Sequence, residues 1–227
     1  MKHASAFILA AAATLAAPAI ANAQWYGGLS LGQSRTDDEL VRNRESTVVN
    51  GTVTGSSFDS TDTGYKVFGG YRFLSWLAVE ANYTDLGESR LRTGVATTGP
   101  TETGSFTMDR KINGFGVDAV FSAPIGEHAS VFGKVGAVRS ELEAKATLAG
   151  SLVFTSGDPN DRSRTTKRDE TVTRIGLGGE YMFTKNAGMR IEYERWLDVG
   201  KKFEIGGQGT TGEADTDFYS LSVIYRF

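Results

Sequence analysis

Hydrophobic and polar residues alternate along the last ten positions of the chain, Phe218 to Phe227. Alternate side chains of an extended strand point to opposite faces, so this segment has one apolar face and one polar face that includes Arg226. The apolar face consists of Tyr219, Leu221, Val223, Tyr225 and Phe227. The pattern predicts a half-buried strand that ends on an aromatic residue.

Seven earlier segments show the same period of two and predict seven more strands. Their ranges are Trp25–Ser34, Thr63–Phe73, Trp76–Leu86, Lys111–Ser122, Ala129–Leu142, Thr171–Phe183 and Gly188–Leu197. Three connections are short turns, at Leu74–Ser75, Ala123–His128 and Thr184–Ala187. Four connections are long and polar, and we expect exposed loops at Thr36–Asp62, Gly87–Ser105, Glu143–Asp169 and Asp198–Ala214.

Short turns that alternate with long loops are typical of barrels in the bacterial outer membrane, where the turns are periplasmic and the loops extracellular. Each predicted strand has roughly the 9 to 11 residues that cross a bilayer at a tilt. The sequence therefore predicts an all-β fold: an eight-stranded antiparallel up-and-down transmembrane β-barrel with short periplasmic turns and long extracellular loops.

A soluble eight-stranded barrel is the alternative, because it shows the same alternation with the two faces exchanged. Charged residues on the predicted inner face are too numerous for a dry apolar cavity. This predicted lumen charge network comprises Lys66, Arg72, Glu80, Asp118, Lys134, Arg174, Glu180, Arg190, Glu192 and Glu194. Aromatic residues also gather at both ends of the outward face, as in the two interfacial belts of membrane barrels. They are Trp25, Phe73, Trp76, Phe121, Phe183 and Phe227 at the turn end, and Tyr65, Tyr83, Tyr193 and Tyr219 nearer the loops.

The first 23 residues have the features of a secretory signal peptide. Lys2 precedes an apolar run from Ala6 to Ala17, and Ala21-Asn22-Ala23 forms an A-x-A cleavage site. We expect residues 1–23 to be cleaved, which leaves a barrel domain over 24–227 and changes the formal net charge from −3 to −4 through the loss of Lys2. This mildly acidic balance does not indicate nucleic-acid binding. Because the chain has no cysteine, disulfides and thiolate metal sites are excluded.

Several short motifs occur in the order and spacing of a known family. They are Gly69-Gly70-Tyr71-Arg72-Phe73, the segment from Val79 to Gly87, Gly178-Gly179-Glu180-Tyr181, Arg190-Ile191-Glu192-Tyr193 and Tyr225-Arg226-Phe227. With them the mature chain resembles the barrel domain of the outer-membrane protein A family of transmembrane barrels. The resemblance implies an outer-membrane location and a C-terminal signal, Tyr219 to Phe227, for the assembly machinery. We also expect the chain to lack the peptidoglycan-binding domain that many relatives carry.

The resemblance implies a polar network in the lumen that includes Glu80, Glu180 and Arg190. A basic residue usual on the fourth strand has no counterpart here, and Lys66, Lys134 or Arg174 are the residues expected to compensate. Eight strands enclose an interior that side chains can fill, and nearly balanced charges favour a plugged lumen over a wide channel. The alternative is a narrow pore that opens when pairs such as Glu80 and Arg190 rearrange.

We expect a structural role in outer-membrane integrity, with a narrow porin-like pore as a further property. The alternative is a surface adhesin or ligand-binding protein that acts through its loops. An enzyme is not expected, because His3 leaves with the signal peptide and His128 lies in a periplasmic turn, away from any serine of the outer rim. Scarce histidine and absent cysteine also disfavour zinc, and no cofactor is expected.

The expected partners are outer-membrane lipid and lipopolysaccharide, the assembly machinery, and a host or cell-surface ligand of the loops; we expect a monomer. Four basic residues of the third loop are candidates to contact lipopolysaccharide phosphates, because guanidinium groups match phosphate oxygens. They are Arg162, Arg164, Lys167 and Arg168. The alternative for these four residues is a solvated charged loop.

Overall fold

The computed structural model describes residues 25–36, 51–59, 61–97, 103–151, 160–199 and 214–227, and these residues are almost entirely β-strand. The strands are β1 (Trp25–Thr36), β2 (Gly51–Asp59), β3 (Thr61–Leu74), β4 (Leu77–Thr97), β5 (Thr103–Ile125), β6 (Ala129–Gly150), β7 (Ser163–Met182), β8 (Ala187–Val199) and β9 (Ala214–Arg226). Within these ranges no helix is long and apolar enough to cross a membrane. The predicted signal peptide lies outside the described residues.

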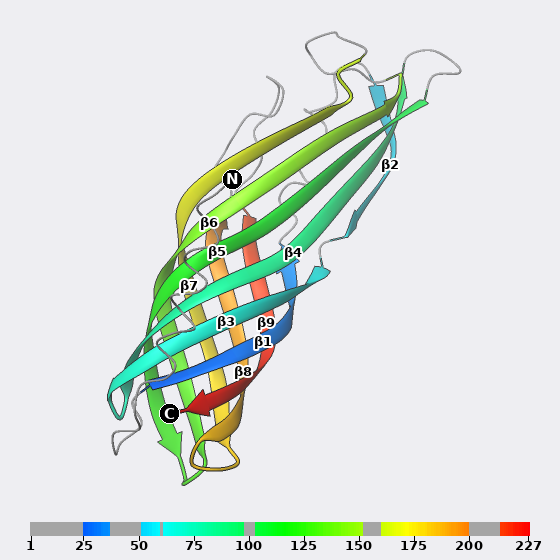
Figure 1. The fold of residues 1–227 in the computed structure, drawn as a ribbon. Coiled ribbons are helices and arrows are strands. Elements are labelled where there is room, and N and C mark those ends of the chain that lie inside the picture. Colours follow the sequence, from blue (N-terminus) through cyan, green and yellow to red (C-terminus); the bar gives the residue numbers. More distant parts are fainter. Residues whose placement is uncertain (1–24, 37–50, 60, 98–102, 152–159, 200–213) are drawn as a thin grey trace.

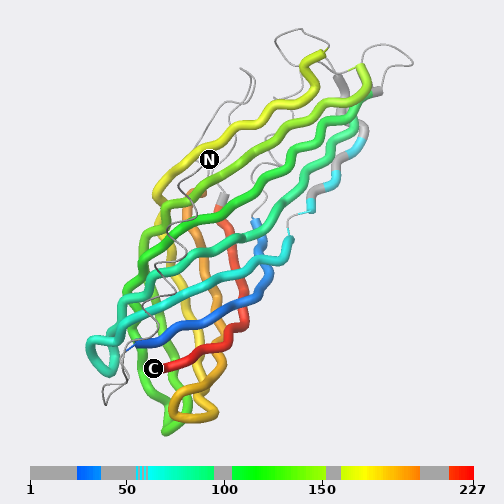
Figure 2. Tube along the Cα trace, in the orientation of Figure 1, coloured from blue at the N-terminus to red at the C-terminus, as the bar shows by residue number. Residues whose placement is uncertain are grey.

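The strands close into a single ring. They follow one another in the order β4, β3, β1, β9, β8, β7, β6 and β5, and β5 pairs again with β4. Figure 2 shows the closure, with β1 in blue between β3 and the red β9. Strand β2 takes the same ring position as β3, because β3 pairs with β4 up to Asp85 and β2 pairs with it from Arg90 onward. The predicted eight-stranded antiparallel barrel is confirmed.

The three tight turns lie at one end of the barrel, where β9 also ends (Figure 1). One is shorter than predicted, because β5 runs on to Ile125 and only residues 126–128 separate it from β6. Gly126 has a φ of 76°, a left-handed conformation that glycine adopts without steric cost. We call this the turn end of the barrel and the opposite end the loop end.

The predicted alternation decides which side chains face the lumen. Leu29 and Leu31 on the outer face are 64% and 69% exposed, whereas Lys66 on the inner face is fully buried. Outward aromatic residues contact one another at both ends, for example Trp76 with Phe121 at the turn end and Tyr193 with Tyr219 nearer the loop end. The predicted apolar band and its aromatic belts are therefore present.

The structure corrects the extent of three predicted loops. Strands β4 to β7 continue far beyond the apolar band, and β2 pairs with the continued part of β4 (Figure 1). We call this part the extension. It comprises β2, Glu88–Thr97, Thr103–Lys111, Arg139–Gly150 and Ser163–Thr171. The fourth predicted loop lies mostly outside the described residues.

The alternation inverts in the extension, which explains why its strands were not predicted. In the band the outer residues are apolar, whereas on β6 of the extension the inner residues Leu142, Ala144 and Leu148 are buried and Lys145 points outward and is exposed. Water surrounds the outer face there, so charged residues take the positions that apolar residues hold in the band. On β4 a bulge between Asp85 and Glu88, with Gly87 at a φ of 80°, exchanges the faces of the strand as well.

Gly136 is one position where the lumen requires glycine. A Cβ there would overlap the carbonyl oxygen of Val117 and the Asp118 carboxylate, whereas a Cβ at Gly133 on the same strand would meet only the Gly176 carbonyl at 3.9 Å. We expect Gly136→Ala to lower the free energy of unfolding by about 1–3 kcal/mol, as overpacking does, and Gly133→Ala to change it by less than about 0.5 kcal/mol. Urea unfolding of the refolded variants in lipid vesicles measures both, and equal effects would contradict the close approach.

Candidate functional site: the charged lumen

Charged side chains fill the middle of the lumen, and they form two clusters. The loop-side cluster comprises Lys66, Asp118, Lys134, Arg174, Glu192 and Glu194, all fully buried. Lys66 Nζ lies 2.5 Å from Glu192 Oε2 and 2.8 Å from Glu194 Oε2, and Lys134 pairs with the same two glutamates. Two acids that are neighbours on the inner face of β8 are thus neutralised by lysines from β3 and β6.

Arg174 completes this cluster through a forked contact with Asp118. Its Nη2 lies 2.5 Å and its Nε 3.1 Å from the two carboxylate oxygens, and its Nη1 lies 3.3 Å from Glu194. Asn82 bridges the pair, because it donates to Asp118 at 2.8 Å and accepts from Arg174 at 2.9 Å. These side chains come from strands on opposite sides of the ring, so the cluster ties the barrel walls together across the lumen.

The turn-side cluster is built around Arg190. Its guanidinium pairs with Glu80 at 2.7 Å and with Glu180 at 3.3 Å, and Glu180 also pairs with Arg226 of the last strand. The Arg190 guanidinium lies 4.6 Å from the ring centroid of Phe68 and 4.7 Å from that of Phe132. Since a cation over an aromatic face is attracted by the ring quadrupole, these rings also stabilise the buried charge.

The two clusters contain five bases and five acids, so their charges balance. The bases are Lys66, Lys134, Arg174, Arg190 and Arg226, and the acids are Glu80, Asp118, Glu180, Glu192 and Glu194. Buried ions are tolerated when they are paired and hydrogen-bonded. Each of these charges has a partner of opposite sign, and Glu80 Oε1 and Arg190 Nε are left without a hydrogen bond to the described residues.

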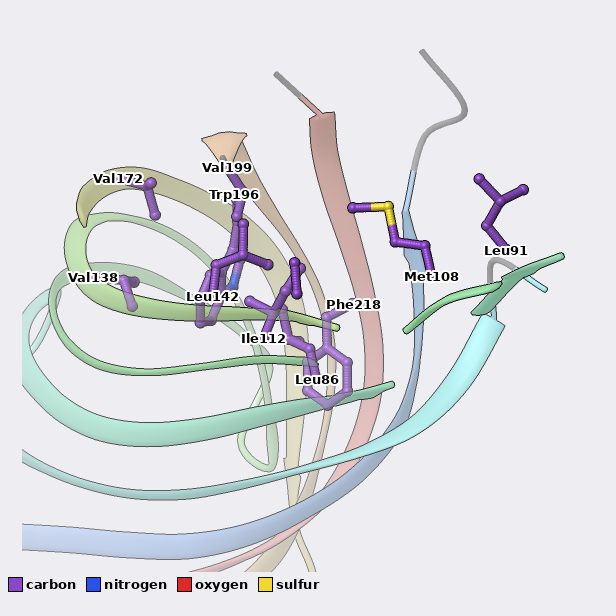
Figure 3. Close-up of a cluster of buried hydrophobic side chains, with 11 residues drawn as sticks. Leu86, Leu91, Met108, Ile112, Val138, Leu142, Val172, Trp196, Val199 and Phe218 are labelled. Carbon is purple, nitrogen blue, oxygen red and sulfur yellow. The ribbon is translucent and has the colours of Figure 1, made fainter. Parts of the chain in front are cut away.

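Apolar layers lie on both sides of the charges. On the turn side the layer consists of Tyr26, Phe68, Ala78, Val120, Phe132, Met182 and Ile224. On the loop side Leu86, Ile112, Leu142, Trp196 and Phe218 gather at the mouth of the barrel (Figure 3), and the buried cluster continues along the extension to Met108 and Leu91. Strand β8 shows the order along one strand, because Arg190, Glu192 and Glu194 are followed by Trp196 of the loop-side layer.

Nine of the ten residues of the predicted lumen network lie in these clusters, and Arg72 does not. Arg72 is half-buried at the turn end, where it donates to the Ser75 carbonyl at 3.2 Å and lies over the Tyr26 ring. Arg226 takes its place as the fifth base. The β9 alternation already put Arg226 on the inner face, but its position next to the end of the chain concealed its role.

Tyr26 and Asn82 are further members that sequence reasoning missed. The Tyr26 hydroxyl donates to Glu80 Oε2 at 3.2 Å, and Asn82 joins Asp118 to Arg174. Asn82 is two residues from Glu80 on the same strand and so shares its inner face, and a search for polar as well as charged inner residues would have found it. Tyr26 carried no such signal, because most tyrosines of the chain lie on the outer face.

The four basic residues proposed for lipopolysaccharide contact do not form one patch. Arg162 donates to the Gly150 carbonyl at 2.7 Å and Arg164 pairs with Asp161 at 2.6 Å. Lys167 lies on the outer face of β7, where its ammonium is 2.7 Å from Glu143, and these contacts raise the Lys167 pKa. Arg168 follows it on the strand and so points to the opposite face. Contact of these residues with lipopolysaccharide stays a prediction, but not as a single cluster.

Arg110 is a buried cation of the extension that the sequence did not single out. It is 3% exposed on the inner face of β5, and none of its three guanidinium nitrogens makes a hydrogen bond to the described residues. Burial lowers the pKa of Arg110 to about 10, against an opposing attraction to Glu170. At neutral pH the group is therefore charged, buried and poorly compensated.

The described part of the chain holds no group of three or more His, Cys, Asp or Glu side chains arranged to bind a metal ion. Every lumen carboxylate discussed above already faces a lysine or arginine. These acids are therefore committed to ion pairs within the barrel.

A closed ring with an apolar outer band, two aromatic belts and a charged, filled interior defines a transmembrane β-barrel. The sequence matches the family model of the outer membrane protein beta-barrel domain over residues 6–227. The chain belongs to this family, and its place is the outer membrane of a Gram-negative bacterium.

Individual relatives are consistent with the family. The chain is 26% identical to outer membrane protein A of Yersinia pseudotuberculosis over 95% of its own length and 52% of that protein. The chain thus spans about half the length of the curated relatives it matches. In fold it is similar to Neisserial surface protein A, with a TM-score of 0.50, 14% identity and coverage of 90% of this chain and 97% of that one. The outer membrane protein OprG from Pseudomonas aeruginosa is similar to the same extent, with a TM-score of 0.50, 11% identity and the same two coverages.

Removal of the Arg190 guanidinium tests the turn-side cluster. We expect Arg190→Met to lower the free energy of unfolding by about 3–5 kcal/mol, because Glu80 is then left buried without its cation. The double variant Glu80→Gln/Arg190→Met removes both charges and should recover a large part of that loss, since Arg226 still pairs with Glu180. Urea unfolding in lipid vesicles measures the three free energies. A double variant no more stable than the single one would show that the pair is not coupled.

Replacement of Arg110 should raise the free energy of unfolding, whereas replacement of Arg190 should lower it. Arg110→Met removes a buried cation that makes no hydrogen bond to the described residues and fills its place with an apolar side chain, so we expect the free energy of unfolding to rise by about 1 kcal/mol or more. Arg139→Met, at an exposed position of the next strand, is the control and should change it by less than about 0.5 kcal/mol. A destabilised Arg110→Met variant would show that the guanidinium has a compensating partner.

Proposed function

We propose that the protein is a structural barrel of the outer membrane whose lumen does not conduct. The observation that carries this proposal is the filled interior: ten balanced, paired charges, nine of them buried, together with the two apolar layers. An ion that crossed this barrel would have to break buried pairs and also pass Trp196 and Phe218, which are fully buried in the loop-side layer. Neither step is compensated by water in a lumen that side chains fill.

The same geometry supports the other parts of this role. Charge pairs between strands on opposite sides of the ring make the barrel rigid. The outward face of β9 ends in the contacting rings of Tyr225 and Phe227, and this aromatic end suits a signal for the assembly machinery. Because the ring closes within one chain, no partner is needed to cover a strand edge in the membrane, which supports a monomer. A catalytic role has no support in the turn, where His128 is exposed beside Tyr181.

Conductance of the refolded protein in a planar bilayer tests the proposal. We expect wild type to insert and to show no discrete openings, and a general porin inserted into the same bilayer is the positive control. Glu80→Ala and Arg190→Ala, which break the turn-side cluster, are measured alongside. Discrete openings in wild type that either substitution alters would place the function in the lumen and overturn the proposal.

Binding of a ligand at the cell surface is a second candidate function, and the extension favours it. The extension carries strands well past the apolar band on the extracellular side, with a charged and hydroxyl-bearing outer face. A structural barrel needs no such elongation, because the band alone spans the membrane. Binding sites in proteins are often placed at the edge of a rigid scaffold, and this one stands on the sealed barrel.

Shortening β4 and β5 separates the two roles. Arg90 and Asp109 are directly opposite in the β4–β5 ladder, so residues 91–108 can be replaced by Asn-Gly, which closes a two-residue hairpin. For a surface-binding protein, cells with the shortened barrel should lose adhesion while the barrel still inserts. Unchanged adhesion would leave only the structural role.

A further inference from the structure

The outer face of the extension carries a hollow of about 550 Å³ where β2, β4 and β5 lie side by side. Its lining includes Gly55, Ser57, Arg92, Gly94, Ser105 and Thr107. All of the polar residues among them are neutral except Arg92. The hollow faces the outside of the cell, away from both the lumen and the apolar band.

Three successive rows across these strands explain the chemistry of the hollow. In the first row Arg90 lies between Asp59 and Asp109, and its guanidinium is 2.5 Å from the Asp109 carboxylate and 2.9 Å from Glu88. This arginine is therefore neutralised by its neighbours, and it is not among the residues that line the hollow.

In the second row Arg92 lies between Ser57 and Thr107. Both neighbours are hydroxyl residues, and the ion pairs of the described residues include Arg90 but not Arg92. Arg92 is exposed on the same face of the same strand, two residues from Arg90. It therefore offers a guanidinium that pairs with no acid among the residues that the structure describes.

In the third row Gly94 lies between Gly55 and Ser105. The absence of side chains at the two glycines leaves the backbone accessible and makes the depth of the hollow. A Cβ placed at Gly55 would meet no atom within 4 Å, so this floor is open space. A flat ring can approach the strands there more closely than at any position with a side chain.

We propose that this hollow binds an anionic saccharide, with the Arg92 guanidinium on its phosphate, sulfate or carboxylate group. Guanidinium groups form forked, charge-assisted hydrogen bonds with such anions. The hydroxyls of Ser57, Ser105 and Thr107 can donate hydrogen bonds to sugar hydroxyls and accept hydrogen bonds from them. A simple phosphate or an acidic peptide carries few such hydroxyl groups. The proposal rests on the second candidate function, surface binding, and names the ligand class for it.

Two sources can supply this chemistry. One is the phosphorylated core saccharide of lipopolysaccharide in the same outer membrane, and the other is a sulfated glycan on another cell. The probes of the experiment therefore include both.

Binding to the refolded protein in detergent is measured by calorimetry. The probes are a deacylated, phosphorylated lipopolysaccharide core oligosaccharide, a sulfated heparan oligosaccharide, and the dephosphorylated and desulfated forms of the same two molecules. We expect at least one anionic probe to bind and its neutral form to bind about tenfold more weakly or not at all, as the loss of one charge-assisted contact predicts. The probe that binds identifies the source.

Three variants locate the binding. Arg92→Gln should weaken binding about tenfold, whereas Arg90→Gln, which removes the same charge from the same face of β4, should change it by less than about twofold. Gly55→Trp should abolish binding of every probe, because its side chain fills the floor of the hollow. Heat-modifiable migration of each variant on gels verifies that the barrel has folded.

Equal binding of charged and neutral probes, equal losses in the two arginine variants, or binding that survives Gly55→Trp would each overturn the proposal, as would no binding of any probe. None of these outcomes bears on the sealed lumen, which the conductance measurement tests separately. Surface binding of another ligand would still show as lost adhesion on shortening β4 and β5, with Arg92→Gln cells adhering normally.

Discussion

The structure depends on how a narrow lumen accommodates ten charged side chains. A buried ion is stable only with a partner at close range, so each acid of the lumen must meet a base from another strand. Glu192 and Glu194 on β8 meet Lys66 from β3 and Lys134 from β6, so these pairs form only when the three strands lie in the right register around the ring. The same requirement fills the middle of the lumen with paired side chains.

The environment around the barrel explains the rest of the chain. Within the band the outside is lipid, so apolar residues point out and charges are forced inward. Beyond the band the outside is water, and β6 carries Lys145 outward and Leu142 and Leu148 inward. The same strands thus have apolar residues on the outer face within the band and on the inner face beyond it. The apolar layer that includes Trp196 lies where this polarity reverses.

This inversion matters for function because it makes the extension a separate structure on the same strands. The lumen commits its charges to one another, whereas on the outer face of the extension Arg92 lies between Ser57 and Thr107 and pairs with no acid of the described residues. We propose that the first arrangement makes the barrel rigid and that the second binds a ligand.

The sequence by itself determined the fold class, the eight strand positions in the band and the inner face on which Glu80, Glu180 and Arg190 lie, because a strand has a strict period of two and lipid allows only one polarity. It also indicated that the lumen charges would balance. It could not determine which acid meets which base, since Arg226 and Arg72 share the inner side of their strands and only closure of the ring brings Arg226 to Glu180. Nor could it show the extension, because the expected polarity reverses where the solvent changes. Tertiary structure alone decided these features, because pairing partners and solvent boundaries depend on where distant strands meet in space.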